Sequence, residues 1–131
     1  MSLAVPPAAT NPSPLSSDAP QRARTVGVLG GGQLGRMFVH TAQRMGFRVL
    51  VLDPDADAPA GRAADRLLRA AYDDPVALAE LAACCVAVTT EFENVPASAL
   101  QALARTCAVA PGADAVRICQ HRALEKLHFQ R

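Results

Sequence analysis

The segment from Thr25 to Met37, T-V-G-V-L-G-G-G-Q-L-G-R-M, constrains the fold more than any other part of the chain. It begins with a short run of β-branched and apolar residues, which is typical of a buried strand in a parallel sheet. Gly30, Gly32 and Gly35 follow with the spacing G-x-G-x-x-G. Such glycines let the backbone turn tightly, and the free N–H groups at the start of a following helix attract an anion. The segment therefore predicts a glycine turn that binds a nucleotide or another phosphate-bearing ligand.

The residues after the glycines predict an amphipathic helix over 33–45. Its apolar side chains recur three or four positions apart, which is the spacing of a buried helix face; they are Leu34, Met37, Phe38, Ala42 and Met45. Gly46 then stands where a C-terminal glycine cap belongs. The alternative interpretation of the glycines is that they only allow this helix to pack closely on the strand.

Strands and helices alternate along the rest of the chain. We expect further strands at 48–52, 66–72, 85–90 and 108–111, and helices after Pro75, after Pro96 and from residue 113. The side of the last helix that we expect to be apolar carries Val116, Cys119, Ala123 and Leu127. The alternation predicts an open, doubly wound α/β domain with a parallel sheet, which binds ligands beyond the carboxyl ends of its strands.

Composition restricts the class of protein. Half of the 131 residues are hydrophobic and only 4% are aromatic, so we expect a core of alanine, valine and leucine. The 13 basic and 12 acidic residues give a net charge of +1, which provides no electrostatic footprint for nucleic acid or an anionic membrane. No apolar run approaches the roughly 20 residues of a membrane-spanning helix. We therefore expect a partner that is neither nucleic acid nor membrane.

The chain divides into three parts by composition. Residues 1–24 are rich in proline, alanine and serine, and we expect this tail to be disordered. Residues 25–112 form the expected α/β domain, and 113–131 the start of a linker helix. The cysteines, Cys84, Cys85, Cys107 and Cys119, form no C-x-x-C pair. We interpret them as buried free thiols in a reducing cytoplasm.

Three acidic residues follow the ends of predicted strands. Asp53 lies 18 positions after Gly35, near the place where an acid of a dinucleotide-binding unit bonds a ribose hydroxyl. Pro54 follows at once, so Asp53 could equally belong to a solvated turn. Glu91 and Glu93 lie within T-T-E-F-E-N-V-P and would point to one side of an extended chain. They could bond a ligand hydroxyl or amine, do acid–base work, or be solvated loop acids.

Two motifs together carry a family resemblance. G-G-G-Q-L-G-R-M at Gly30–Met37 and T-T-E-F-E-N-V-P at Thr89–Pro96 resemble the N-terminal domain of the 5-(carboxyamino)imidazole ribonucleotide synthases. The segment Pro111–Lys126 resembles the family's entry into its ATP-grasp region. The resemblance covers about residues 25–131.

The resemblance implies a Rossmann-like, pre-ATP-grasp domain of an enzyme that joins 5-aminoimidazole ribonucleotide and bicarbonate, using ATP and Mg²⁺. It implies that the turn formed by Gly31, Gly32, Gln33 and Leu34 holds the phosphate or ribose of the substrate. Asp53, Glu91 and Glu93 would line the same substrate. Arg122 would contact ATP, although His121 stands where the family usually has an acid. The family is also expected to dimerise.

The ATP-grasp domain has no counterpart in these 131 residues. Without its lysines and metal-binding acids, the charge of phosphoryl transfer cannot be stabilised, so we expect no carboxylase activity and no tight ATP binding from this chain alone. Two alternatives remain at this point. One is the NAD(P)- or FAD-binding domain of an oxidoreductase, and the other is a non-catalytic ligand-binding module.

Overall fold

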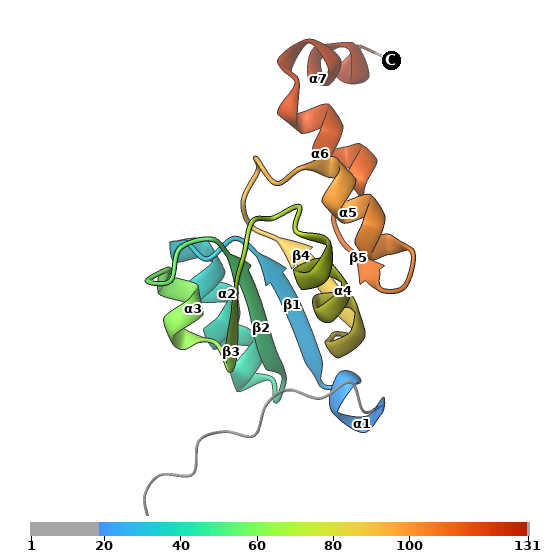
Figure 1. Cartoon of the computed structure of the whole chain (residues 1–131). Helices are drawn as coiled ribbons and strands as arrows, with labels where there is room; N and C mark the ends of the chain where they lie inside the picture. The colour runs from blue at the N-terminus through green and yellow to red at the C-terminus, as the bar shows by residue number, and fades with distance from the viewer. Residues whose placement is uncertain (1–18, 131) are drawn as a thin grey trace, which may run out of the picture.

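The computed structural model describes residues 19–130. β1 (Thr25–Leu29) lies in the middle of a five-stranded parallel sheet with the strand order β3-β2-β1-β4-β5 (Figure 1). The other strands are β2 (Arg48–Asp53), β3 (Arg66–Arg69), β4 (Ala87–Thr90) and β5 (Ala108–Val109). The open, doubly wound parallel sheet expected from the alternation of elements is therefore confirmed.

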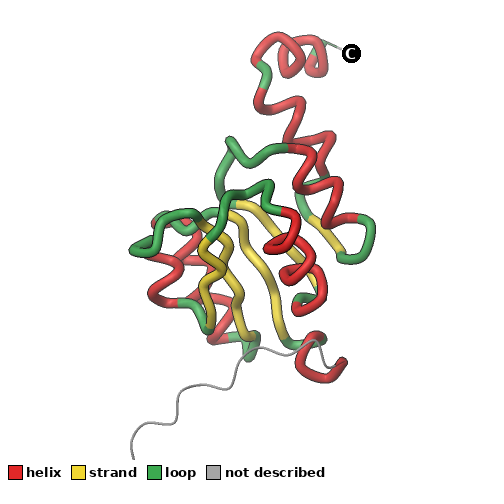
Figure 2. The backbone as a smooth tube through the Cα atoms, viewed as in Figure 1, coloured by secondary structure: helices red, strands yellow, loops and turns green. Residues whose placement is uncertain are grey.

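Helices cover both faces of this sheet, which Figure 2 shows as a yellow layer between red helices. α2 (Gln33–Arg44) and α3 (Pro59–Ala63) pack on one face. α4 (Pro75–Cys84) and α5 (Ala97–Ala104) pack on the other. Successive side chains of a strand point to opposite faces of the sheet, so each face has its own core. Val28 belongs to the core beside α2 and α3, and Leu29 to the core beside α4 and α5.

The ends of the helices follow the local sequence. Asp74 caps α4 by accepting a hydrogen bond from the Ala77 N–H at 2.9 Å, and Pro75 occupies the first turn. Gly46 ends α2 with a φ of +89°, as expected for a C-terminal glycine.

The helix expected from residue 113 is two helices, α6 (Ala113–Gln120) and α7 (Arg122–Phe129). The break is at His121, whose backbone is extended with φ −121° and ψ 102°. Val116 is buried, whereas Cys119, Ala123 and Leu127 are exposed, so the expected buried side was wrong beyond the first turn. α7 buries no residue because it rises beyond the sheet (Figure 1).

The predicted face of α2 was wrong in part. Val39 and Ala42 are buried, but Leu34, Met37 and Met45 are 64–70% exposed. The spacing of three or four residues fits both the side of α2 that meets the sheet and the neighbouring side that does not. The sheet is met by the side with the smaller residues, where α2 can approach closely.

Most of the expected N-terminal tail, residues 1–18, lies outside the described residues. Within them, α1 (Ala19–Arg22) forms a helical turn before β1, and the Arg22 side chain donates to the Thr106 carbonyl at 3.0 Å. The division of the chain at residue 112 stays a prediction, although Val116 of α6 belongs to the core. No helix among the described residues combines the length and the apolar character that crossing a bilayer requires.

The cysteines differ in burial, which corrects the expectation that all are buried. Cys84, Cys85 and Cys107 are buried, whereas Cys119 is exposed, and no disulfide joins any of the four. Burial raises the pKa of the three buried thiols above its ordinary value, most strongly at Cys85. The folded chain therefore favours the neutral thiols.

We expect the free energy of unfolding to fall as the pH rises above about 8.5, the ordinary pKa of cysteine. The raised pKa values mean that the unfolded chain releases these protons first, so the stabilisation is complete below that pH and is lost above it. Urea unfolding in reducing buffer at a series of pH values measures the slope. Cys85→Ala should flatten the slope while the control Cys119→Ala leaves it unchanged; equal slopes in all three proteins contradict this account.

Candidate functional site

The glycine turn lies between β1 and α2, at the edge of the sheet where the strands end. The strand register aligns Leu29 with Leu52 of β2 and with Thr90 of β4. The residues that come after these aligned positions, Gly30, Asp53 and Glu91, are therefore brought to one place. The structure thus unites three of the segments that the sequence singled out.

Asp53 binds the glycine turn from the β2 side. Its side chain is buried, and Oδ2 accepts a hydrogen bond from the Gly31 N–H at 2.7 Å. Oδ1 accepts another from the Asp55 N–H at 2.8 Å. The Gly31 carbonyl in turn accepts from the Ala60 N–H of α3 at 2.8 Å. Asp53 is therefore bonded into the fold and is not a solvated turn acid.

Glu91 binds the same turn from the β4 side. Its Oε1 accepts a hydrogen bond from the Gly32 N–H at 3.0 Å. A Cβ atom on Gly30, Gly32 or Gly35 would lie 2.9, 3.3 or 3.1 Å from this oxygen. All three glycines of the G-x-G-x-x-G motif thus make room for one carboxylate oxygen at the positive end of α2.

These contacts change the expected mode of anion binding. The N–H groups of Gly31 and Gly32, which the motif predicted for a ligand phosphate, already bond Asp53 and Glu91. The next N–H groups, of Gln33 and Leu34, find no acceptor among residues 19–130. Such unpaired donors are usual in a first helical turn, and Gln33 and Leu34 are exposed at the start of α2.

Glu93 lies in a turn, outside the extended chain on which the expected alignment of Glu91 and Glu93 depended. β4 ends at Thr90, and the chain then turns, with the Val95 N–H bonded to the Phe92 carbonyl at 3.4 Å. The strand alternation therefore stops. Glu91 is partly buried against the glycine turn, whereas Glu93 is exposed.

Tyr72 and Gln120 also hold this site, and the sequence reasoning missed both. The Tyr72 hydroxyl donates to Asp53 Oδ2 at 2.7 Å. The Gln120 side-chain amide of α6 donates to the carbonyls of Glu93 and Val95 at 2.7 and 2.6 Å. The available signal for Tyr72 was that the chain's single tyrosine stands at the end of a predicted strand; nothing in the sequence pointed to Gln120.

Arg122 is not brought to the glycine turn. It is the first residue of α7 and is exposed, beside Glu125, Lys126 and Phe129 in a shallow depression. Within the described part of the chain there is no group of three or more histidine, cysteine, aspartate or glutamate side chains placed to hold a metal ion.

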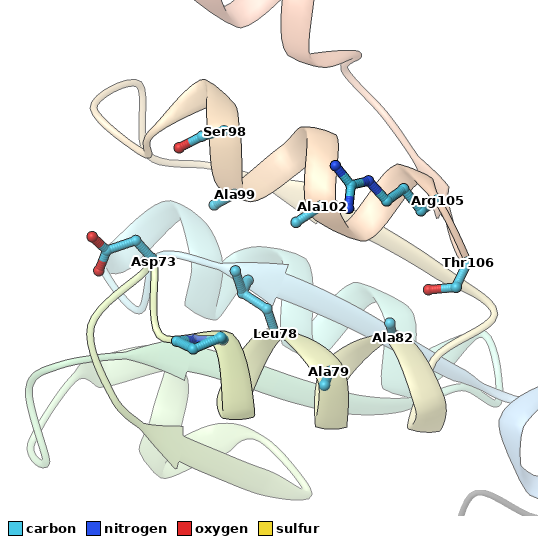
Figure 3. Close-up of a pocket in the computed structure, with 10 residues that line it drawn as sticks. Asp73, Leu78, Ala79, Ala82, Ser98, Ala99, Ala102, Arg105 and Thr106 are labelled. Carbon is cyan, nitrogen blue, oxygen red and sulfur yellow. The ribbon is translucent and has the colours of Figure 1, made fainter.

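A separate groove of about 420 Å³ lies between α4 and α5 (Figure 3). Leu78 and several alanines line its length, with Asp73 and Ser98 at one end and Arg105 and Thr106 at the other. Ligand sites normally combine an apolar wall with convergent polar groups. Here the polar groups are at opposite ends, and we assign no ligand to the groove.

The parallel sheet, the glycine turn and the carboxylates at its edge define a Rossmann-like ligand-binding domain. The profile of the ribonucleotide synthetase preATP-grasp domain matches residues 23–120, and the chain belongs to this family.

Curated relatives support the assignment. The chain is 52% identical over 102 residues to an N5-carboxyaminoimidazole ribonucleotide synthase of Brucella melitensis, and 44% identical over 106 residues to that of Staphylococcus saprophyticus. These matches cover 78% and 81% of this chain. The chain spans only 28% of the length of each of these relatives.

Solved structures agree with the fold. The N5-carboxyaminoimidazole synthetase of Staphylococcus aureus, complexed with ADP, superposes with a TM-score of 0.77 at 40% identity, covering 82% of this chain and 29% of that one. The Aspergillus clavatus enzyme, in complex with ADP and 5-aminoimidazole ribonucleotide, has a TM-score of 0.74 at 38% identity over 84% of this chain and 30% of its own. The pre-ATP-grasp fold expected from the two motifs is confirmed.

We predict that Gly35→Ala destabilises the chain by about 2 kcal/mol, the usual cost of overpacking. A Cβ there would lie 2.5 Å from the Gly30 carbonyl oxygen, and 3.1 Å from Glu91 Oε1. Thermal unfolding measures the change. The matched control is Gly112→Ala, because Gly112 also stands at a helix start and a Cβ there meets nothing within 4 Å. Equal stability of the two variants contradicts the close packing described for the turn.

Proposed function

We propose that this chain is the substrate-binding front part of an enzyme that carboxylates 5-aminoimidazole ribonucleotide with bicarbonate and ATP, in de novo purine biosynthesis. The observation that carries the proposal is the glycine turn whose Gly32 N–H bonds the Glu91 carboxylate. It occurs in a chain that is 52% identical to an N5-carboxyaminoimidazole ribonucleotide synthase. A relative has been solved with this ribonucleotide and ADP. A cytoplasmic location and a homodimer belong to the same proposal.

The ribonucleotide would meet two kinds of group at the turn. The free N–H groups of Gln33 and Leu34, at the positive end of α2, suit its phosphate. The ribose hydroxyls and the amine of the ligand are hydrogen-bond donors. They suit the exposed carboxylate of Glu93 and the carboxylate oxygen of Glu91 that does not bond Gly32. Gly31 and Gly32 would shape the turn, with their N–H groups held by Asp53 and Glu91.

The same contacts disfavour a dinucleotide. In a dinucleotide-binding unit the pyrophosphate lies against the glycine turn at the start of the helix. Here the N–H groups of Gly31 and Gly32 already bond Asp53 and Glu91, so the turn has fewer N–H donors left than a pyrophosphate needs. NAD is therefore the control ligand and not the proposed one.

The chemistry of ATP would come from outside the described residues. In a complete enzyme, ATP and Mg²⁺ would supply phosphoryl transfer to bicarbonate, and Arg122 would be this chain's contact with ATP. The role left to the described residues is to bind the ribonucleotide and orient its amine. This division of roles explains why the chain is proposed to bind substrate without turning it over.

Calorimetric titration of the purified chain with 5-aminoimidazole ribonucleotide should show saturable binding, with none for NAD. Glu93→Gln should weaken it about tenfold, the effect of losing one hydrogen bond to a charged group. Gly32→Val should weaken it as well, because the larger side chain crowds Glu91 Oε1. Asp114→Asn is the control, since Asp114 is an exposed acid of α6. Binding of NAD alone would overturn the proposal.

The chain alone should show no ATP- and bicarbonate-dependent consumption of 5-aminoimidazole ribonucleotide. The physical reason is that the described residues include no cluster of three or more histidine, cysteine, aspartate or glutamate side chains that could hold a metal ion to stabilise phosphoryl transfer. Phosphate release and product formation, followed together, provide the measurement. Turnover that requires all three substrates would contradict the prediction.

A further inference from the structure

Tyr72 contacts both segments that hold the glycine turn. It follows β3, and its hydroxyl donates to Asp53 Oδ2 at 2.7 Å. Its ring lies 5.7 Å from the ring of Phe92, between centroids, with an interplanar angle of 38°. Phe92 stands between Glu91 and Glu93, so one side chain links the β2 end to the loop after β4.

The hydrogen bonds of Asp53 show why this link matters. Oδ2 accepts from the Gly31 N–H and from Tyr72, and Oδ1 accepts from the Asp55 N–H. The first and third donors belong to the main chain. Tyr72 donates from its side chain, and it shares the oxygen that holds Gly31.

The Tyr72 phenol is suited to a permanent donor role. Burial raises its pKa above the ordinary value, and the hydrogen bond to Asp53 and the charges of Asp53 and Glu91 raise it further. The hydroxyl therefore keeps its proton throughout the neutral pH range.

We propose that Tyr72 is a positioning residue for the ribonucleotide site. Its hydroxyl keeps Asp53 bonded to the Gly31 N–H, and its ring holds Phe92, so that the turn and Glu91 are in place before the ligand arrives. This inference rests on the proposed function for the identity of the ligand. It also gives Asp53 an internal role in place of the ribose contact expected from the sequence.

A direct contact between the ligand and Asp53 would give the opposite result on removal of the Tyr72 hydroxyl. If a ribose hydroxyl bonded Asp53 Oδ2, the ligand would have to displace the Tyr72 hydroxyl, and removing that hydroxyl would help binding. Tyr72→Phe removes only the hydroxyl and keeps the ring beside Phe92. Under the positioning role it should weaken binding of 5-aminoimidazole ribonucleotide about five- to tenfold, the effect of one hydrogen bond to a charged group. Equal or tighter binding overturns the proposal.

Amide hydrogen exchange tests the positioning without any ligand. Tyr72→Phe should raise the exchange rate of the Gly31 amide about tenfold, the effect of weakening one hydrogen bond. The Gly32 amide, which bonds Glu91, should change much less. An unchanged Gly31 rate overturns the proposal. Absence of ribonucleotide binding by the unaltered chain would instead overturn the proposed function and leave this test standing.

Two further variants complete the design. Asp65→Asn is the matched control, because Asp65 also accepts a main-chain N–H, from Val49 at 2.8 Å, at the opposite edge of the sheet. It should leave exchange at Gly31 unchanged. Phe92→Leu removes the ring contact and keeps the Tyr72 hydroxyl; it should weaken ligand binding and preserve protection of Gly31. If Tyr72→Phe does not fold, unchanged ligand binding by Phe92→Leu overturns the role of the ring contact.

Discussion

The hydrogen bond from the Gly32 N–H to Glu91 is the contact on which the site depends. It places a carboxylate at the positive end of α2, where unpaired N–H groups and the helix dipole stabilise negative charge. The three motif glycines leave the space that this oxygen needs. A motif commonly associated with a ligand pyrophosphate therefore holds a side chain of the protein itself. The ligand that fits beside it is one that brings hydrogen-bond donors to a carboxylate.

The parallel sheet makes this contact possible between residues far apart in sequence. The register pairs Leu29 with Leu52 and with Thr90, so the residues after three strands meet at one edge. Asp53, Tyr72 and Phe92 then connect these strand ends through side chains. The Gln120 amide extends the connection to α6 by holding the loop carbonyls. The loops of the site are therefore held together by side-chain contacts with one another, beyond the carboxyl ends of the strands.

Some errors of the sequence analysis have a common physical origin. Apolar spacing identified α2 as a helix but assigned Leu34, Met37 and Met45 to the buried side, because one period fits two neighbouring sides of a helix. Strand alternation paired Glu91 with Glu93 because it assumed that β4 continues, whereas the chain turns after Thr90. The last helix was extended through His121, where nothing in the apolar pattern marks an extended residue. The local spacing of apolar residues does not show where a helix or strand ends or which neighbouring element it packs against.

The sequence by itself determined the succession of strands and helices along the chain and the parallel sheet, because strand runs, glycine spacing and helix caps act over a few residues. The family followed from the resemblance of two motifs. The sequence also predicted that the glycine turn, Asp53 and Glu91 lie together beyond the ends of the strands, which their hydrogen bonds confirm. Only the tertiary structure decided that Asp53 and Glu91 bond the N–H groups of the turn, and that Tyr72 supports Asp53. The reason is that these bonds join residues 19 to 59 positions apart, and no local pattern encodes which side chain fills a space that distant segments create.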